Sequence, residues 1–454
     1  MNRMARLGCS FAVPLFAAVL SVPAQAQQLP PAPGAQVTTV SAEPGTWTEP
    51  SVAINPLNPQ QVVAVFQYTA HAAYSTDAGR TWTLATGVAP PDYRMSGDVS
   101  VVFDNQGHAI LGCIAFDKLG TFNYWAHGAT RNGIFLKRSL DGGKTWESQL
   151  RAVVAQSTQP GIPFEDKPYF VADTSKTSRY AGNLYVGWTR WTLADSQMLF
   201  SRSTDDGVTW SQPIEIARDR GLPRDDNGAL EGFDGLVGPD GTIYAVWAER
   251  NHIELTQSRD GGKSFSRARD VIETAPIMFA VQGMDRANGF PQIAIDPRGG
   301  SKGGPLYISW SDYRNGEIDI FVSESSDHGR HWSAPVKVNS DPVHDGADHF
   351  FQWLAVDPVS GAVNVVFYDR REDPQNKTQV VVLARSTDGG KSFSNYAWTT
   401  APFDPEGVFL GDYLGLAAWG NRVYGAWPVR NGTEKKTSLQ VGVADFSPAA
   451  MASR

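Results

Sequence analysis

The amino-acid sequence predicts an all-β chain built from repeated units. Its 454 residues include 44 glycines, 29 prolines and 14 tryptophans, a mixture that favours many tight turns and many buried aromatic anchors. Hydrophobic residues make up 41% and charged residues 19%, so the chain can bury a large core. An octapeptide recurs six times, at residues 75–82, 139–146, 203–210, 258–265, 325–332 and 386–393. Its copies are 55 to 67 residues apart, the length of one supersecondary unit.

Each octapeptide has the chemistry of a tight turn. Written as S-x-D-x-G-x-[ST]-[WF], it is best preserved in "SLDGGKTW" at 139–146 and "STDGGKSF" at 386–393. The glycine two positions after the aspartate suits a turn residue with positive φ. The aspartate can accept hydrogen bonds from the N–H groups of its own turn, and the final aromatic residue can anchor the next strand.

This pattern resembles the Asp-box of the sialidase-like (BNR-repeat) β-propeller superfamily. The six copies span residues 75–393, which is most of the chain. The resemblance implies a propeller of four-stranded blades, in which each box joins the two outer strands of a blade on the face away from the ligand. We therefore expect a structural role for the boxes, within a single propeller domain at residues 27–454.

A second repeat counts the blades. Seven short strands that end in turn-like sequences, from "SVAINPLNP" to "YLGLAAWGN", are each followed by a second strand such as "LYVGWTR". The seventh unit lacks an outer strand, whereas "AQVTTVSAE" at 35–43 is strand-like and belongs to no unit. Because closing the ring removes its exposed edges, we expect residues 36–42 to complete the last blade. Seven blades are predicted, with six and an irregular edge as the alternative.

Residues 1–26 are predicted to form a signal peptide that is cleaved. Arg3 and Arg6 precede an apolar run, and Ala24 and Ala26 suit a cleavage site. A secreted or periplasmic protein is expected, without a membrane anchor after cleavage.

The formal charge of −8 argues against nucleic acid as a partner. Cys113 would be the only cysteine left, so we expect no internal disulfide. A monomer is expected.

Strand direction predicts where a site lies. In a four-stranded blade, the start of the innermost strand and the end of the second strand reach the same face. Acids stand at or near six of the seven inner-strand starts: Glu49, Asp98, Asp166, Asp234, Asp348 and Asp412. Arginines, among them Arg190 and Arg370, follow several second strands. Crowded carboxylates raise one another's pKa, so we expect a functional site at the mouth of the axial channel.

The resemblance also implies an activity, hydrolysis of terminal sialic acids. Matching positions give Tyr413 as nucleophile and Glu231 or Asp234 as its carboxylate partner, and Asp98, from the acids at the inner-strand starts, is a further catalytic candidate. Candidate substrate-binding residues are Arg250, Arg314, Arg370 and Arg190. Glu49, in "TEPSVAI", stands where that family has its first arginine, so we do not expect turnover of standard sialyl substrates.

Two other functions stay open. The carboxylates at the channel mouth could hold Ca²⁺ through oxygen ligands, which would make a Ca-dependent enzyme, although no compact metal-binding motif is visible. The aromatic residues and arginines of the same face, such as "WTRW" at 188–191, could instead form a non-catalytic surface that binds a glycan or a protein. The expected partner is thus a glycan or another small-molecule or polysaccharide ligand.

Overall fold

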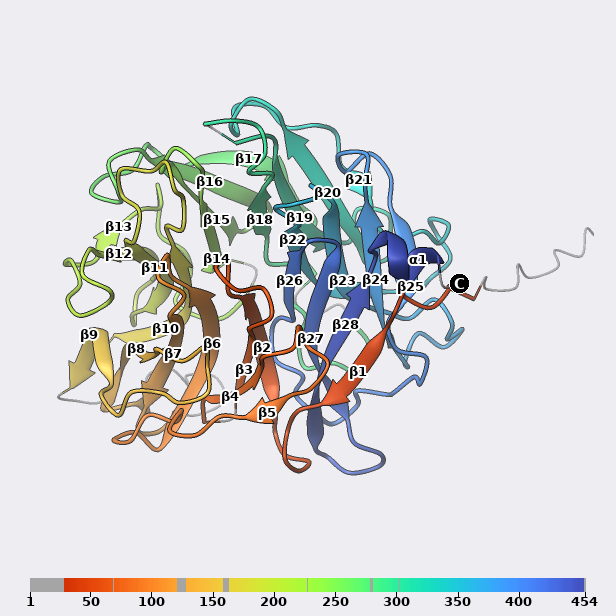
Figure 1. Ribbon diagram of the computed structural model, residues 1–454, viewed down its shortest axis with the longest axis horizontal. Helices are drawn as coiled ribbons and strands as arrows, with labels where there is room; N and C mark the ends of the chain where they lie inside the picture. The colour runs from red at the N-terminus through yellow and green to blue at the C-terminus, as the bar shows by residue number, and fades with distance from the viewer. Residues whose placement is uncertain are drawn as a thin grey trace, which may run out of the picture.

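A computed structural model describes residues 28–452, except 68, 121–127, 158–162, 227, 278–280 and 302. These residues form seven antiparallel sheets of four strands each, set in a ring around a central axis (Figure 1). The predicted fold, a β-propeller, is confirmed, and its count of seven blades excludes the six-bladed alternative. The predicted signal peptide at 1–26 lies outside the described residues.

The strands fall into four layers, from the axis outward. The innermost strands are β2 (Thr48–Ile54), β6 (Met95–Phe103), β10 (Phe164–Ala172), β14 (Leu230–Val237), β18 (Gln292–Ile295), β22 (His349–Val356) and β26 (Gly415–Trp419). The second strands are β3 (Val62–Gln67), β7 (Ala109–Phe116), β11 (Leu184–Trp191), β15 (Ile243–Glu249), β19 (Leu306–Asp312), β23 (Val363–Asp369) and β27 (Arg422–Arg430).

The third strands are β4 (His71–Ser75), β8 (Arg131–Ser139), β12 (Ser196–Ser203), β16 (His252–Ser258), β20 (Asp319–Ser325), β24 (Val380–Ser386) and β28 (Thr437–Asp445). The outermost strands are β5 (Thr83–Leu84), β9 (Arg151–Ser157), β13 (Ile214–Glu215), β17 (Arg269–Glu273), β21 (Val336–Lys337), β25 (Ser394–Ala397) and β1 (Gln36–Thr39). The short helix α1 (Pro448–Ala452) follows. Among the described residues, no helix is long and apolar enough to cross a membrane.

The last blade is closed by the N-terminal strand, as predicted. In Figure 1, β1 lies beside β28, and the two strands pair antiparallel from Gln36 opposite Val443 to Thr39 opposite Gln440. The pairing continues past the strand, where Val40 N–H donates to the carbonyl of Leu439. The seventh sheet therefore contains strands from both ends of the chain.

The core lies between neighbouring blades, where the aromatic side chain of one blade enters the next. A Cβ added to Gly112 of β7 would come within 2.0 Å of the Phe170 ring of β10. In the same way, a Cβ on Gly187 of β11 would meet Phe233 of β14 at 2.2 Å. Both glycines are thus required by close packing between blades, because any side chain there would displace the ring.

The six octapeptides each join the third strand of a blade to its outermost strand, at the end away from the innermost strand's start. In the first copy, Asp77 accepts hydrogen bonds from the Thr81 hydroxyl at 2.7 Å and from its N–H at 2.9 Å. These bonds hold the pKa of Asp77 down to about 2. Ser75 completes the turn by accepting a bond from Gly79 N–H at 2.8 Å.

We expect the octapeptide aspartates to stabilise the fold without taking part in function. Asp141→Ala removes the acceptor for the N–H groups of Lys144 and Thr145, so it should lower the free energy of unfolding by about 1–3 kcal/mol. Activity or ligand affinity per folded molecule should not change. The measurement is chemical denaturation, with the exposed Asp92→Ala as a neutral control. If Asp141→Ala lost most of its function at unchanged stability, the functional site would lie on the face that carries the octapeptides.

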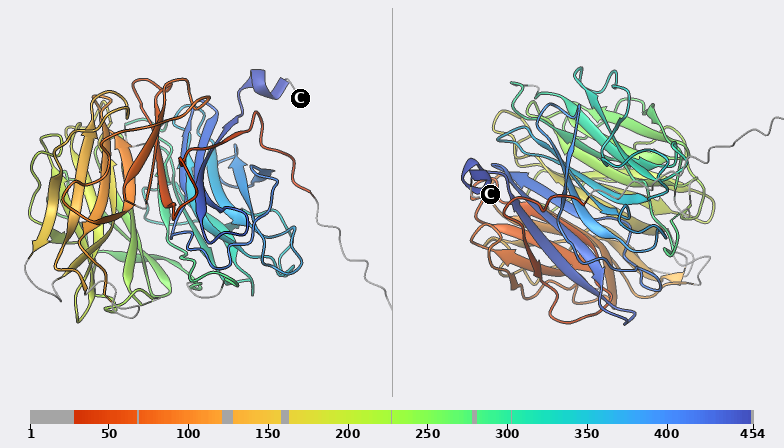
Figure 2. Two further views of the ribbon diagram at one scale, coloured as in Figure 1. Left: turned by 90° about the horizontal axis from the view of Figure 1, so that it is seen from below. Right: turned by 90° about the vertical axis from the view of Figure 1, so that its right-hand side faces the viewer.

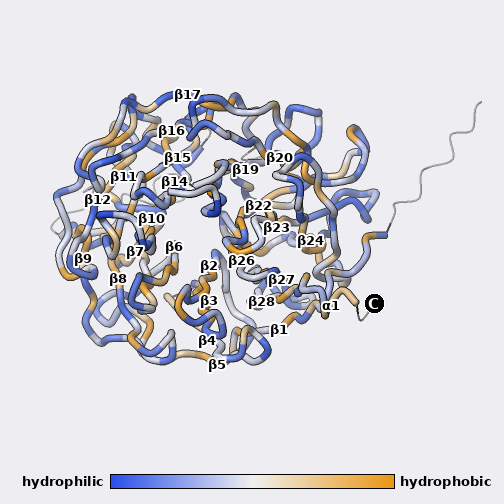
Figure 3. The backbone as a smooth tube through the Cα atoms, turned by 45° about the horizontal axis from the view of Figure 1, so that its top comes forward, coloured by the Kyte–Doolittle hydropathy of each residue, from blue (hydrophilic) through white to orange (hydrophobic). Residues whose placement is uncertain are grey.

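The strands run between two loop-bearing faces of the ring, as the side view in Figure 2 shows. Six of the innermost strands, β2, β6, β10, β14, β22 and β26, can be followed around the centre in Figure 3. Their first residues pair with the last residues of the second strands, for example Thr48 with Gln67. These ends therefore meet on the face opposite the octapeptides, where the sequence predicts the site.

Candidate functional site

A cavity of about 770 Å³ opens at this face, at the mouth of the central channel. Five carboxyl groups from five blades line it, and we call them the carboxyl cluster: Glu49, Asp98, Asp166, Glu231 and Asp412. Each of these residues is at most 9% exposed. Apolar residues also line it, among them Phe116 and Phe409, which we call its apolar wall. The cavity thus combines a floor of buried acids with an apolar side.

Bulges in the innermost strands turn these acids into the channel mouth. The register of β2 against β3 shifts between Thr48 and Ser51, and Glu49 within this bulge has a φ of 50°. β6 has the same shift, with Asp98 at a φ of 44°. Such a conformation is uncommon for residues other than glycine, and bulges of this kind often re-aim side chains beside functional sites.

Two cations offset part of the cluster's negative charge. Arg286, from the segment between β17 and β18, donates two hydrogen bonds of 2.6 Å to the oxygens of Asp412. It also forms an ion pair of 3.1 Å with Asp225. Lys167 lies in the channel, with its Nζ 4.1 Å from the centre of the Tyr413 ring. The carboxyl groups therefore outnumber the cations beside them.

This imbalance raises the pKa of some acids of the cluster and leaves that of another lowered. Burial and the neighbouring carboxylates Asp98 and Asp412 raise the pKa of Glu49 well above its usual value. Burial likewise raises the pKa of Asp98, against the pull of Lys167. Burial also acts on Asp412, but the Arg286 guanidinium outweighs it and holds the pKa of Asp412 below its usual value. A carboxyl group of lowered pKa thus lies beside carboxyl groups of raised pKa, a combination suited to general acid–base chemistry.

The predicted catalytic residues are divided between the cavity and the channel below it. Asp98 and Glu231 line the cavity. Asp234 lies deeper and accepts a hydrogen bond from Ile293 N–H of the next blade at 2.7 Å. Ser51 links the first two blades through Val101 N–H in the same way, so Asp234 has the geometry of an inter-blade link. Burial raises the pKa of Asp234 to about 7.

Tyr413 also lies below the cavity, packed 5.7 Å from the ring of Trp353 and 5% exposed. Its hydroxyl is 3.3 Å from the carbonyl of Val99. Burial and the nearby carboxylates Asp98 and Glu49 raise the pKa of Tyr413 well above its usual value. Its environment therefore opposes formation of a phenolate, and its role as a nucleophile stays a prediction.

The four predicted substrate-binding arginines do not line the large cavity. Arg190 pairs with Glu165 at 2.6 Å, and Arg314 forms an ion pair with Asp312. Arg370 is fully buried and donates to the carbonyls of Gln282 and Asn376. Arg250 is exposed and lines a separate small cavity. Substrate binding by these arginines stays a prediction, and three of them already have partners within the fold.

Sequence reasoning missed three charged residues around the cluster: Arg286, Lys167 and Asp225. Arg286 belongs to no repeat, because it lies in the long connection between Glu273 and Gln292. The sequence held one hint of its role. This unusually long segment precedes β18, the one innermost strand at whose start no acid was predicted. Asp225 likewise comes from a loop before its blade, and Lys167 directly follows Asp166 in the strand.

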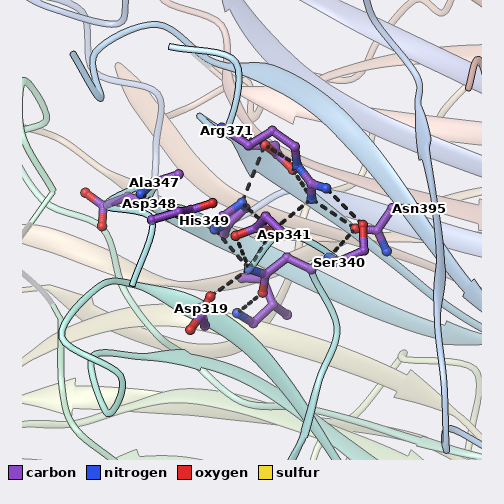
Figure 4. A network of polar contacts seen from close by, with 12 residues as sticks. Asp319, Ser340, Asp341, Ala347, Asp348, His349, Arg371 and Asn395 are labelled. Atoms are coloured by element: carbon purple, nitrogen blue, oxygen red, sulfur yellow. Dashed lines mark hydrogen bonds and ion pairs between the residues drawn. The ribbon is translucent and has the colours of Figure 1, made fainter. Parts of the chain in front are cut away.

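Two further groups of acidic residues have spacings that could suit a metal ion, but cations already lie against both. Figure 4 shows the first group, Asp319, Asp341 and His349, beside Arg371. Lys337 Nζ lies 3.3 Å from carboxylate oxygens of both Asp319 and Asp341. In the second group, Glu249, Glu254 and Asp270 surround Arg218, whose Nη2 lies between 3.1 and 3.8 Å from each. Both groups are therefore ion-pair networks.

Comparison with known proteins finds carbohydrate-active relatives, and no family model matches the chain. A sialidase from Bacteroides fragilis is 34% identical over 193 residues, covering 35% of this chain and 35% of that protein. A xyloglucanase from Acetivibrio thermocellus is 25% identical over 304 residues, covering 62% of this chain and 32% of that protein. The alignments thus span about a third of these relatives' length.

Solved structures share the fold across nearly the whole chain. An ulvan lyase, a member of a polysaccharide lyase family, superposes with a TM-score of 0.51 at 10% identity. The match covers 89% of this chain and 95% of that one. At this identity the likeness concerns the fold alone.

Proposed function

Because the chain is a β-propeller of the sialidase-like superfamily, we propose that it processes a glycan at the mouth of its central channel. The observation that supports this most is the cavity itself, in which carboxyl groups of raised pKa and one of lowered pKa share one space. Its volume of about 770 Å³ is within the range of small-molecule sites. We propose further that the protein acts after export, which N-terminal sequencing of the mature chain would test.

In the proposed reaction, two carboxyl groups cleave a glycosidic bond. Asp98, whose pKa is raised by burial, is the proposed general acid and protonates the oxygen of the leaving sugar as the C–O bond breaks. Asp412, held ionised by Arg286, takes a proton from the water that attacks the sugar carbon. The apolar wall around Phe116 and Phe409 suits the C–H face of a sugar ring.

The acid-lined floor favours neutral glycans over carboxylated ones. A sialic acid carboxylate would face the carboxyl cluster, whereas the guanidinium of Arg286 is already paired with Asp412 and Asp225 and the other lining cations, Lys435 and Lys436, are exposed side chains. A panel of neutral and acidic oligosaccharides tests the proposal by measuring product release. Turnover of a neutral glycan supports it, and efficient release of sialic acid would contradict the charge argument. Binding without turnover of any glycan would support the non-catalytic alternative.

Asp98→Asn tests the catalytic role directly. Asparagine tolerates the positive φ of this position, so the variant should fold, but it cannot donate the proton. We expect kcat to fall about 10²–10⁴-fold with little change in glycan affinity. Asp348→Asn is the matched control, since Asp348 also stands at the start of an inner strand but accepts bonds from Ile318 N–H and the Asn376 amide and does not line the cavity. Equal effects of the two substitutions would remove Asp98 from the proposed mechanism.

A further inference from the structure

A second, much smaller cavity lies beside the first, between the fourth and fifth blades. Its volume is about 50 Å³, well short of the roughly 300 Å³ at which small-molecule sites begin. Its lining includes Glu231 of β14, Ser311 of β19, Asn288 from the segment before β18, and the exposed Arg250. Glu231 also lines the large cavity, so one side chain separates the two spaces.

Polar atoms without protein partners gather around this small cavity. Among the described residues, Glu231 Oε2 has no N–H or hydroxyl donor and its carboxyl group is bonded to that of Asp225, and no hydrogen bond reaches Ser311 Oγ or either polar atom of the Asn288 amide. Their residues are only 4%, 2% and 3% exposed, respectively. Native proteins satisfy nearly all buried polar atoms, and each failure costs about 1–3 kcal/mol. Several such atoms lining one space indicate that the space holds a polar ligand.

The oxygen atoms among these groups are of the kind that binds a hard cation. The side chains offer a carboxylate, an amide oxygen and a hydroxyl, which are the oxygen ligands that Ca²⁺ prefers. The surroundings are acidic, since Asp226 also lines the cavity and the carboxyl group of Asp225 lies against that of Glu231. Within the described residues, Arg250 forms no ion pair with Glu231. A cation would satisfy the three oxygens and offset the charge but would leave the Asn288 Nδ2 donor unpaired, whereas water could pair with donor and acceptors without offsetting the charge.

We propose that this cavity binds a hard, oxygen-ligated cation such as Ca²⁺ through Glu231 Oε2, Asn288 Oδ1 and Ser311 Oγ. The ion would tie the fourth blade to the fifth, because its ligands come from both. It would also fix the segment that carries Arg286, since Asn288 lies two residues further along the chain. The site is distinct from the two ion-pair networks, and it does not depend on the proposed glycan chemistry.

Calcium titration of the EDTA-treated full chain tests the site, with MgCl₂ and NaCl titrated in parallel. Isothermal titration should show one site for Ca²⁺, and Ca²⁺ above its Kd should raise the melting temperature with the logarithm of its concentration. Asn288→Ala and Ser311→Ala should each weaken the Ca²⁺ Kd about 10-fold or more. Asn288→Asp adds a carboxylate, so it should lower the melting temperature in EDTA and tighten Ca²⁺ binding. Asn251→Ala, on the exposed surface next to Arg250, should change neither quantity.

Crystals grown with CaCl₂ locate the ion by anomalous diffraction. A peak within contact of Glu231, Asn288 and Ser311 supports the proposal. Three results would overturn it: an ordered water without anomalous signal, a chloride at Arg250, or Ca²⁺ binding that both alanine variants leave unchanged. Because these readouts require no substrate, they stay informative even if no glycan is turned over.

Discussion

A chain that begins at Thr46 is expected to be far less stable than one that begins at Gln28, and to aggregate. The truncation removes β1, so the outer edge of β28 loses its partner along Gln36–Thr39. It also removes the bonds that tie Ala32 to Ala397 and Gly45 to Thr437. At about 1 kcal/mol for each backbone hydrogen bond, the loss is on the order of 5 kcal/mol. An exposed strand edge then favours pairing between molecules.

Thermal unfolding and size-exclusion chromatography measure both effects. The matched control ends the chain at Ser447 and so removes α1, in which no residue is buried. We expect this control to melt within a degree or two of the reference chain. If the Thr46 chain melted at the same temperature as the reference and stayed monomeric, β1 would contribute nothing to closure.

Arg286→Met is expected to produce the second large effect, a loss of stability that depends on pH. The substitution keeps an unbranched apolar stem but removes the guanidinium, so it leaves Asp412 and Asp225 without their cation. At pH 7 we expect a loss of about 3 kcal/mol, at the low end for breaking a buried ion pair because the Arg286 side chain is 27% exposed. The same substitution at Arg298, which is 47% exposed, should cost less than about 1 kcal/mol.

The pH dependence follows from the sign of the Asp412 shift. Its pKa is lowered in the folded protein, so the pair stabilises the fold above the unfolded pKa of about 4 and loses this contribution as pH falls through the folded pKa. In Arg286→Met, burial should instead raise the pKa of Asp412, so the variant loses stability as pH rises above about 4. Denaturation at several pH values should show a difference from wild type that is largest at neutral pH. An equal difference at pH 4 and pH 7 would argue against the ion pair as its cause.

The fold could be predicted because it repeats. The same structural unit is encoded by six octapeptides and seven strand pairs. An irregular copy such as "SSDHGRHW" therefore does not change the predicted number of blades. Closure by residues 36–42 followed from a mismatch between the two repeats, and the strand forms at Gln36–Thr39. Sequence also placed Glu49, Asp98, Asp166 and Asp412 together, because strand direction alone brings the starts of the innermost strands to one face.

Side-chain direction within the site could not be predicted in the same way. The bulge between Glu231 and Asp234 sends the first residue to the cavity and the second to the neighbouring blade, and nothing in "LEGFDGL" announces it. Arg286 lies outside every repeat, so its position depends on how a long connection folds over the channel. The predicted arginines follow second strands in the sequence, but Arg190 and Arg314 find acids within their own blades.

The closure of the ring has a consequence for the order in which the protein can fold. Strand β1 is synthesised before every other described strand, whereas its partner β28 is the last of them. Six blades can assemble while the chain is still being made, but β1 has to wait unpaired until synthesis is nearly finished. Contacts between such distant segments form slowly, so docking of β1 is expected to be the final and rate-limiting step. During that wait, the free edge of β28 can accept β1 from another copy of the chain, which makes strand exchange the characteristic misfolding route of this protein.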